Sequence, residues 1–304
     1  MMARMPELSR RAILRLGVGA AAGAAGAYAL GSALHTQGAS VAGPPVSMTS
    51  AGAPLAPPPP LEPAPAAMQP TYVDGSFVSA ARGGVATNWA IARPPGQTAP
   101  LRPVIALHGK GQDAAGVMTG GVEQGLAQAV AAGIPPFAVV AVDGGGGYWH
   151  KRASGEDSGA MVLDELVPML GSQGLDTTRV GFLGWSMGGY GALLAAERDP
   201  GGWSVVAVAS PAVWPTFADV WVGDAFDGQA DYARHDVFAG ASRLGRVPVW
   251  VGCGRSDPFY PNARRLAAAV PGARAHWADG GHDQCLWRLA APREIAFVVS
   301  ALLG

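Results

Sequence analysis

The feature that most limits the fold of this chain is the alternation of short apolar runs with helix-like stretches after residue 70. A short apolar run bounded by turn residues predicts a buried strand, and alternating strands and helices predict a mostly parallel sheet with helices on both faces. The expected strands are Gly75–Ser79, Ala86–Ala92, Pro103–Leu107, Phe137–Val142, Arg179–Gly184, Ser204–Ala209, Val247–Gly252 and Ala273–Ala278, and the expected helices are Val117–Ala132, Gly159–Leu170, Gly188–Arg198, Pro261–Val270 and Pro292–Leu303. We therefore predict one α/β domain over residues 71–304.

Residues 1–42 have the pattern of an export signal. Arg10 and Arg11 stand in the order Ser-Arg-Arg-x-Ile-Leu, and the stretch from Leu16 to Leu34 is uncharged and consists mostly of Gly and Ala. The pattern resembles a twin-arginine signal, cleaved or retained, so the expected partner is the twin-arginine export machinery. The alternative is a membrane anchor, because a stretch of about 19 uncharged residues can span a bilayer. We expect an exported protein that is secreted or associated with the cell envelope.

Residues 43–70 predict a spacer between this segment and the domain. They contain a run of four prolines and no hydrophobic period, which is typical of an extended, partly polyproline linker. The whole chain has a formal net charge of −1 and no block of Lys and Arg outside its extreme N-terminus. This charge pattern argues against a nucleic-acid partner and favours neutral or weakly charged substrates.

Ser186 is the candidate nucleophile, in the pattern Gly-Trp-Ser-Met-Gly. Glycine accounts for 44 of the 304 residues, so the spacing alone is weak support. The setting is stronger, because Ser186 lies between an apolar β-run and a good helix, the strand-turn-helix context of a nucleophile elbow. Gly184 and Gly188 fit this interpretation, since a tight turn brings neighbouring backbones too close for a Cβ.

A serine nucleophile needs a histidine base, and the chain offers three histidines after Ser186. His276 lies in an alternating run and is expected to pack on a strand or point out from it. His235 lies in a polar, loop-like region. His282 follows the last expected strand and two glycines, at the edge where the sheet exposes its loops. We therefore predict His282 as the base.

Asp257 is the candidate acid that orients the base, because it follows the β-run ending at Gly252 and reaches the same sheet edge. The alternative is that Asp257 caps the helix that follows Pro258. Asp279 and Asp283 are further candidates, but each is so close in sequence to His282 that its carboxylate would have difficulty facing the imidazole from behind.

Two backbone N–H groups are expected to form an oxyanion hole. One is that of Met187, the residue after the nucleophile. The other belongs to the loop after "PVIALHGKGQDA", where His108 and Gly109 end a strand and Lys110 follows. Lys110 could instead bind phosphate, but no phosphate-binding Gly-x-x-x-x-Gly-Lys-Ser/Thr sequence precedes it. His108 is expected to be structural in this turn.

Residues 142–152, "VDGGGGYWHKR", follow a central strand and are predicted to form a wall of the substrate pocket, with Trp149 or Tyr148 against the substrate. A dinucleotide site is the competing interpretation, but no helix pattern follows with glycines at the required spacing. Residues 214–244 form the longest insertion between strands and predict a small cap, whose aromatic side chains are expected to pack inside it more often than to bind a ligand.

The segments "LHGKG", "VDGGGGYWH", "DELVPML", "GWSMGGYGAL", "GRSD" and "GGHDQCLWR" together resemble the esterase D branch of the α/β-hydrolases and the related secreted mycolyltransferases of actinobacterial envelopes. The resemblance covers residues 71–304. It implies an α/β-hydrolase fold with a short cap, a triad of Ser186, Asp257 and His282, and Lys110 and Met187 as oxyanion donors. The cap, residues 215–245, is short for mycolyl transfer, and no long-chain acyl tunnel is evident in it.

These observations predict an exported serine esterase that uses no metal or organic cofactor and acts on a small-molecule, lipid or sugar ester. An acyltransferase of the cell envelope and a non-catalytic envelope-binding module remain as alternatives. Cys253 and Cys285 flank the proposed acid and base in sequence. Two separate thiols are favoured over a disulfide between them, because Cys253 ends a core strand.

Overall fold

The computed structural model describes residues 70–198 and 204–304. The export signal predicted for residues 1–42 and nearly all of the spacer lie outside the described residues. Within the described ranges, no helix is both long and apolar enough to cross a membrane.

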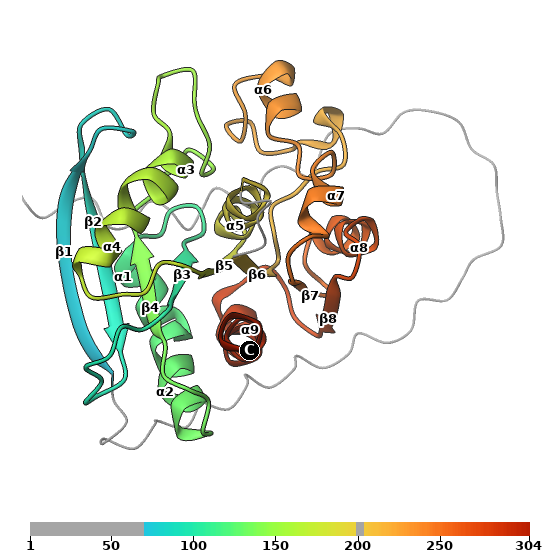
Figure 1. Ribbon diagram of the computed structural model, residues 1–304. Helices are drawn as coiled ribbons and strands as arrows, with labels where there is room; N and C mark the ends of the chain where they lie inside the picture. The colour runs from blue at the N-terminus through green and yellow to red at the C-terminus, as the bar shows by residue number, and fades with distance from the viewer. Residues whose placement is uncertain (1–69, 199–203) are drawn as a thin grey trace, which may run out of the picture. The chain divides into compact units, whose positions relative to one another are not determined.

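In the described part of the chain, eight strands form one sheet in the order β1-β2-β4-β3-β5-β6-β7-β8. β1 pairs antiparallel with β2, and β2 pairs antiparallel with β4, whereas every other neighbouring pair is parallel. The strands are β1 (Thr71–Ser79), β2 (Val85–Arg93), β3 (Pro103–Leu107), β4 (Ala138–Val142), β5 (Val180–Trp185), β6 (Ser204–Ala209), β7 (Val249–Gly254) and β8 (Arg274–Ala278). Figure 1 shows the β1–β2 hairpin at one edge and β8 at the other.

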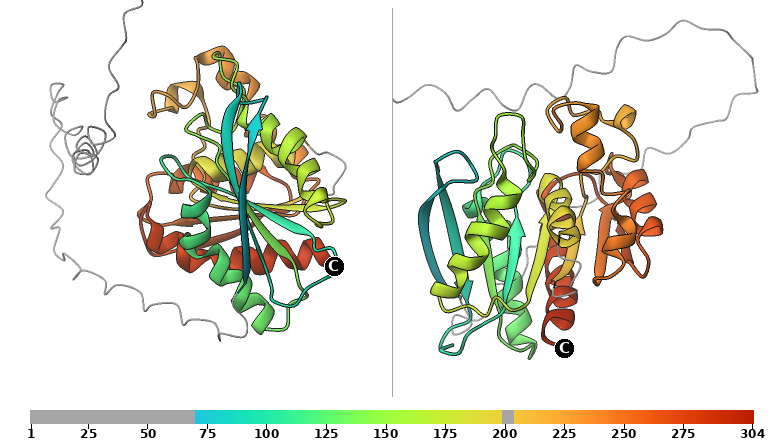
Figure 2. Two further views of the ribbon diagram at one scale, coloured as in Figure 1. Left: turned by 90° about the vertical axis from the view of Figure 1, so that its left-hand side faces the viewer. Right: turned by 45° about the horizontal axis from the view of Figure 1, so that its top comes forward.

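Helices cover both faces of this sheet, and the buried side chains form one cluster on each face. Figure 2 shows the two helical layers from a second direction. On one face lie α3 (Ser158–Ala160), η3 (Met161–Leu166), α4 (Val167–Ser172), α5 (Met187–Glu197), α7 (Ala241–Leu244) and α8 (Tyr260–Ala269). On the other lie α1 (Ala114–Val117), η2 (Met118–Val122), α2 (Glu123–Ala131) and α9 (Gln284–Leu303). The predicted α/β-hydrolase fold is confirmed.

The last helix differs from the sequence prediction at its start. We expected a helix from Pro292, but α9 begins at Gln284 and carries Pro292 in its interior. Proline lacks the N–H that an inner helical position donates, so a start at this residue was the simpler prediction. The helix continues through it because Asp283 caps the earlier start, accepting from the Leu286 N–H at 3.0 Å, and because its apolar face is buried against the sheet.

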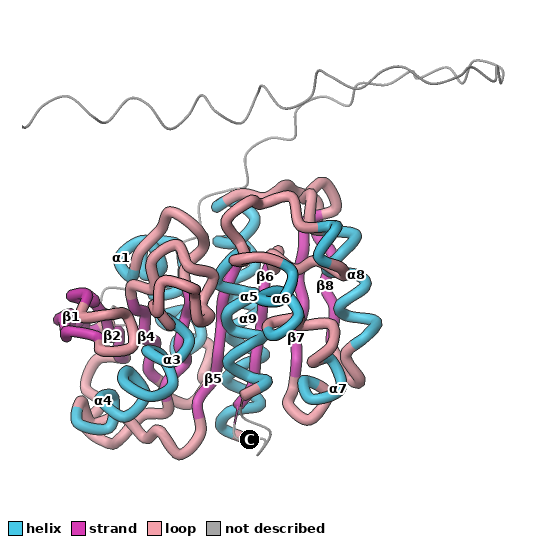
Figure 3. Tube along the Cα trace, turned by 90° about the horizontal axis from the view of Figure 1, so that it is seen from above, coloured by secondary structure: helices cyan, strands magenta, loops and turns pink. Residues whose placement is uncertain are grey.

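The cap lies between β6 and β7 and contains η4 (Phe217–Asp219) and α6 (Gln229–Arg234). In the view of Figure 3, α6 lies in front of α5, and the Tyr190 hydroxyl of α5 donates to the His235 carbonyl at 2.9 Å. Trp214, Phe226 and Tyr232 are buried, and the Phe226 ring contacts the rings of the other two, so they pack the cap as expected.

Glu294 gives the fold a pH dependence that is separate from any activity. Its side chain is fully buried in α9, and neither carboxylate oxygen has a hydrogen-bond partner in the described residues. Burial raises the pKa of Glu294 to about 8. The folded state therefore favours the protonated acid, and this stabilisation is lost as the pH rises from about 4.5 through about 8.

We expect Glu294→Gln to unfold at nearly the same denaturant concentration as the wild type at pH 5. At pH 8 the variant should be more stable by a few kcal/mol, because only the wild type must ionise a buried carboxyl. Equilibrium unfolding at the two pH values measures this difference. Equal stability of the two proteins at pH 8 would show that Glu294 has a partner or reaches solvent.

Candidate active site

Ser186 occupies a strained turn between β5 and α5. Its backbone has φ 55° and ψ −123°, a conformation that few residues other than glycine adopt. A Cβ on Gly184 would lie 2.3 Å from the Gly188 carbonyl oxygen, and a Cβ on Gly188 would lie 1.9 Å from that of Leu107. Both positions therefore require glycine, and the turn has the strand-turn-helix geometry that a nucleophile elbow requires.

Ser186, His282 and Asp257 form a continuous hydrogen-bonded chain. The Ser186 Oγ lies 2.9 Å from His282 Nε2, and His282 Nδ1 lies 2.9 Å from Asp257 Oδ2. These distances suit a hydroxyl that donates to Nε2 and an Nδ1–H that donates to the carboxylate. The structure thus brings together three residues that are separated by 96 and 25 positions in the sequence.

Asp257 is held as a buried carboxylate. Its other oxygen, Oδ1, accepts from the Phe259 N–H at 2.8 Å. Asp257 therefore also stabilises the chain just before α8, in line with the alternative interpretation that it caps this helix. Burial favours the neutral acid, but hydrogen bonds from His282 and the Ser210 hydroxyl outweigh it and hold the pKa of Asp257 below its usual value. Ser210 was not predicted from the sequence.

The other candidate acids have different partners. Asp283 caps α9. The Asp279 side chain is 80% exposed, and one of its carboxylate oxygens lies 3.8 Å from an Arg255 guanidinium nitrogen.

The other two candidate histidines also have different partners. His276 Nε2 lies 2.6 Å from a guanidinium nitrogen of Arg293, and His235 lies in the cap beside Asp231. Of the three candidate histidines, His282 is the one that hydrogen-bonds to the Ser186 hydroxyl.

The loop after β3 lies beside the elbow. Met187 is the first residue of α5, so its N–H has no partner within the helix. The Gln112 Oε1 accepts from the Gly109 N–H at 3.2 Å and from the Trp185 indole N–H at 2.9 Å, which ties the loop that carries Lys110 to β5. Like Ser210, Gln112 was not indicated by any sequence motif.

His108 is structural, as expected. Its Nε2 accepts from the Gly144 N–H at 2.9 Å, so the ring is neutral with its proton on Nδ1, which donates to the Gly109 carbonyl at 2.8 Å. Burial lowers the pKa of His108, which favours this neutral form.

Tyr148 and Trp149, the residues predicted to line the substrate pocket, are both buried. They are only 3% and 2% exposed, and both have positive φ. The Trp149 ring fills the space above Gly144 and Gly191, and its indole N–H donates to the His108 carbonyl at 3.3 Å. Both rings belong to the buried core, and Trp149 also lines a cavity of about 890 Å³, so its contact with a substrate stays a prediction. The Lys110 ammonium lies 5.9 Å from the Tyr148 ring centre and pairs with Asp224.

An aromatic rim borders His282 on the cap side. The ring centre of Phe259 lies 5.2 Å from that of His282, and Trp221 lies 4.6 Å from Phe259. Trp221 is 53% exposed, whereas Phe259 is buried. The sequence placed Trp221 in a cap but gave no sign that its ring would be exposed next to the triad.

The two cysteines are free thiols, with Cys253 buried and Cys285 exposed. Burial raises the pKa of Cys253 to about 12, so this thiol stays protonated and unreactive. The structure agrees with two separate thiols, the favoured alternative.

Comparison with known proteins assigns the family. Residues 86–291, more than half of the chain, match the model of the Esterase family, described as "Putative esterase". A comparison with curated protein sequences gives no significant match.

Solved structures with the same fold include three hydrolases or related proteins. A ferulic acid esterase superposes with a TM-score of 0.66 at 18% identity, over 77% of this chain and 99% of its own. An S-formylglutathione hydrolase from Agrobacterium tumefaciens superposes with a TM-score of 0.66 at 18% identity, over 77% of this chain and 96% of its own. MPT51 from Mycobacterium tuberculosis superposes with a TM-score of 0.56 at 17% identity, over 76% of this chain and 99% of its own. With its family match and its eight-stranded, mostly parallel sheet, the chain belongs to the Esterase family and is a carboxylic ester hydrolase on the α/β-hydrolase fold.

Proposed function

We propose that the protein hydrolyses carboxylic esters through an acyl-enzyme on Ser186. The observation that carries the proposal is the unbroken chain of two 2.9 Å hydrogen bonds from the Ser186 hydroxyl through His282 to the buried Asp257. A catalytic serine needs a base to take its proton, and the base needs a carboxylate to fix its tautomer. An intact triad also argues against a non-catalytic binding module.

The reaction follows from this geometry. The Ser186 Oγ attacks the ester carbonyl carbon while His282 Nε2 takes the hydroxyl proton, and the Lys110 and Met187 N–H groups stabilise the oxyanion. His282 returns the proton to the leaving alcohol, which departs and leaves the acyl group on Ser186. Water, deprotonated by His282, then attacks the acyl-enzyme, and His282 returns the proton to the Ser186 Oγ as the acid is released. Asp257 stays ionised and stabilises the imidazolium in both steps.

The exposed rim next to His282 supports a substrate with an apolar or aromatic group close to the ester. Trp221 offers an exposed apolar ring, which packs on the buried Phe259 ring, and Phe259 in turn contacts the ring of His282. Aromatic faces bind apolar groups and other rings by burying apolar area and by ring stacking.

Adding a sugar acceptor to the assay separates this hydrolase from the alternative acyltransferase, because transfer would yield an acylated sugar in place of the free acid.

We further propose that the protein is exported, on the twin-arginine pattern at Arg10 and Arg11 followed by a proline-rich spacer. This route carries folded proteins, so the domain would reach the envelope with its triad already assembled.

Ser186→Ala should leave the fold intact and lower kcat with p-nitrophenyl esters by at least about 10⁴-fold, because a triad acts as a unit. Asp257→Asn should cause a loss of a similar order, since the amide no longer fixes the His282 tautomer. The matched control is Asp283→Asn, which alters a helix cap and should leave kcat nearly unchanged. A larger loss in Asp283→Asn than in Asp257→Asn would move the acid to the other loop.

Trp221→Ala should raise KM for aryl esters up to about tenfold, with little change in kcat, because it removes an aromatic contact outside the reacting atoms. Phe217→Ala is the matched control, since this exposed cap ring contacts Tyr232 and not the rim. Steady-state kinetics across p-nitrophenyl esters of graded size measure the effect. Equal KM values for the wild type and Trp221→Ala would remove Trp221 from the substrate site.

Replacing Arg10 and Arg11 by lysines should retain active enzyme inside the cell, since the twin-arginine pair would be lost. Cell fractionation with an esterase assay of each fraction measures this. Normal levels of the Lys-Lys variant in the envelope would point to a general secretory signal or a plain membrane anchor.

A further inference from the structure

His150, Asp231 and His235 form a cluster outside the proposed active site. His150 follows β4, whereas Asp231 lies in α6 and His235 directly after it. One possible ligand atom from each of the three lies within 4.8 Å of the others. In the described residues, none of the three hydrogen-bonds to Ser186, Asp257 or His282. The cluster therefore needs an explanation other than ester hydrolysis.

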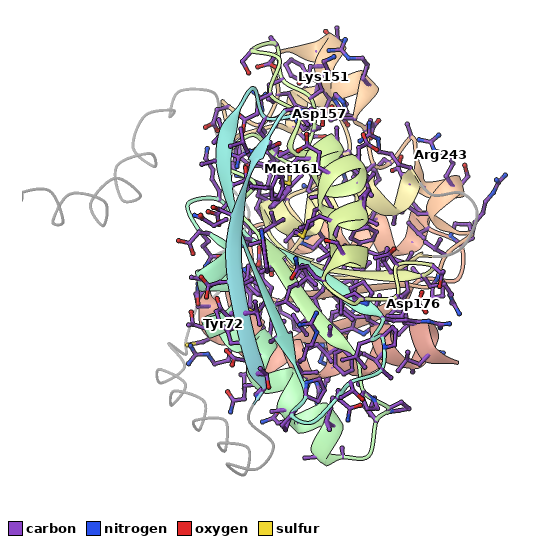
Figure 4. All side chains as sticks on the ribbon, turned by 60° about the vertical axis from the view of Figure 1, so that its left-hand side comes forward. Tyr72, Lys151, Asp157, Met161, Asp176 and Arg243 are labelled. Atoms are coloured by element: carbon purple, nitrogen blue, oxygen red, sulfur yellow. The ribbon has the colours of Figure 1, made fainter. Side chains whose placement is uncertain are left out.

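The cluster lines a cavity of about 890 Å³ between the cap and the helices on one face of the sheet. Lys151, Asp157 and Arg243, which are labelled in Figure 4, belong to the same lining. The residues of the proposed triad do not line it. The side chains of His150 and Asp231 are 2% and 3% exposed, and that of His235 is 20% exposed. A small ion can therefore reach the three groups from the cavity while they stay largely shielded from bulk water.

The separations between these atoms approach the edges of a metal coordination shell. Tetrahedral zinc with bonds of about 2.0–2.1 Å places neighbouring ligand atoms about 3.3 Å apart. His235 Nδ1 lies 3.1 Å from Asp231 Oδ1, and His150 Nδ1 lies 3.8 Å from Asp231 Oδ2. Binding one ion would require the stacked rings of His150 and His235, whose centres are 4.3 Å apart, to rotate toward one carboxylate oxygen. The ion would then replace the 3.0 Å contact of His235 Nδ1 with the Asp231 backbone carbonyl oxygen.

The hydrogen bonding of His150 points to a cation at its Nδ1. Nε2 lies 3.1 Å from the Ala225 carbonyl oxygen, and Nδ1 lies 3.1 Å from the Lys151 carbonyl oxygen. A neutral imidazole has one N–H and can donate to only one of these acceptors. An Nε2–H that donates to Ala225 leaves the Nδ1 lone pair facing the Lys151 oxygen, a contact that either a second proton or a metal cation bound to Nδ1 would make favourable. An outer N–H donated to a backbone carbonyl is the usual arrangement of a metal-binding histidine.

We propose that His150, Asp231 and His235 bind one divalent zinc ion that fastens the cap to the loop after β4. Two imidazole nitrogens and one carboxylate oxygen suit zinc, whereas calcium and magnesium prefer shells made of oxygen. The Lys151 carbonyl or a water molecule from the cavity supplies the fourth ligand. The ion has a structural role, so this inference does not depend on the proposed ester hydrolysis.

Arg234 is the nearest competing cation. Its guanidinium lies 3.1 Å from Asp231 Oδ1, and the Asp227 N–H donates to Oδ2 at 3.0 Å. The Arg234 side chain is 64% exposed and can move into solvent, and each carboxylate oxygen has lone pairs for more than one partner. Removing Arg234 should therefore maintain or strengthen zinc binding.

The test uses the full chain without a polyhistidine tag, stripped with a chelator, dialysed against zinc and analysed by elemental mass spectrometry. The wild type and Arg234→Ala should each retain one zinc per chain, and saturating zinc should raise their Tm by about 5–10 °C at a hundredfold excess over Kd. His235→Ala and His150→Gln should bind zinc at least about 100-fold more weakly. His276→Ala is the control for a histidine outside the cluster and should behave as the wild type.

If His150→Gln fails to fold, His235→Ala decides the result, because His235 has the most exposed side chain of the cluster. Circular dichroism can verify that the His235→Ala variant is folded. Zinc retained equally by the wild type and by His235→Ala would place the ion elsewhere and overturn the proposal. A wild type that binds no zinc and shows no change in Tm would also overturn it, and the cluster would then be a purely hydrogen-bonded link between cap and domain.

Discussion

The proposed site depends on how closely two backbones approach at the nucleophile elbow. Gly188 packs directly against the Leu107 carbonyl, so β3 and the start of α5 lie nearer to each other than any side chain would allow. The Ser186 N–H donates to the Ala209 carbonyl at 3.1 Å, and the Ser186 carbonyl accepts from the Ala212 N–H at 3.0 Å. These contacts on both sides hold a conformation that costs on the order of 1–3 kcal/mol by itself.

The parallel sheet supplies the other proposed groups at the same edge. Lys110 follows β3, Asp257 follows β7 and His282 follows β8, so the carboxyl ends of the strands gather residues that are distant in sequence. A buried carboxylate is costly unless it is paired and hydrogen-bonded. Asp257 meets this condition through His282, the Phe259 N–H and the Ser210 hydroxyl. The groups that satisfy Asp257 also fix the orientation of the imidazole.

The sequence predicted those parts of the fold and site that are set by local pattern. Apolar runs located the strands, and glycine spacing with a strand-turn-helix context located Ser186. Gln112, Ser210 and Trp221 could not be found in this way, because their importance comes from partners far away in sequence. Burial of the rings at Tyr148 and Trp149 depends on positive φ values that their residue types do not favour. The predicted start of α9 was wrong, because tertiary packing outweighs the effect of Pro292 on the helix.

Covalent labelling tests the central claim, that Ser186 is the nucleophile activated by His282 and Asp257. A small organophosphate ester should add one phosphoryl group per chain, and digestion followed by mass spectrometry should place it on Ser186. Asp257→Asn should be labelled far more slowly, while Asp283→Asn should react at the rate of the wild type. A label on another residue, or no label on a folded protein that hydrolyses esters, would contradict this account of the site.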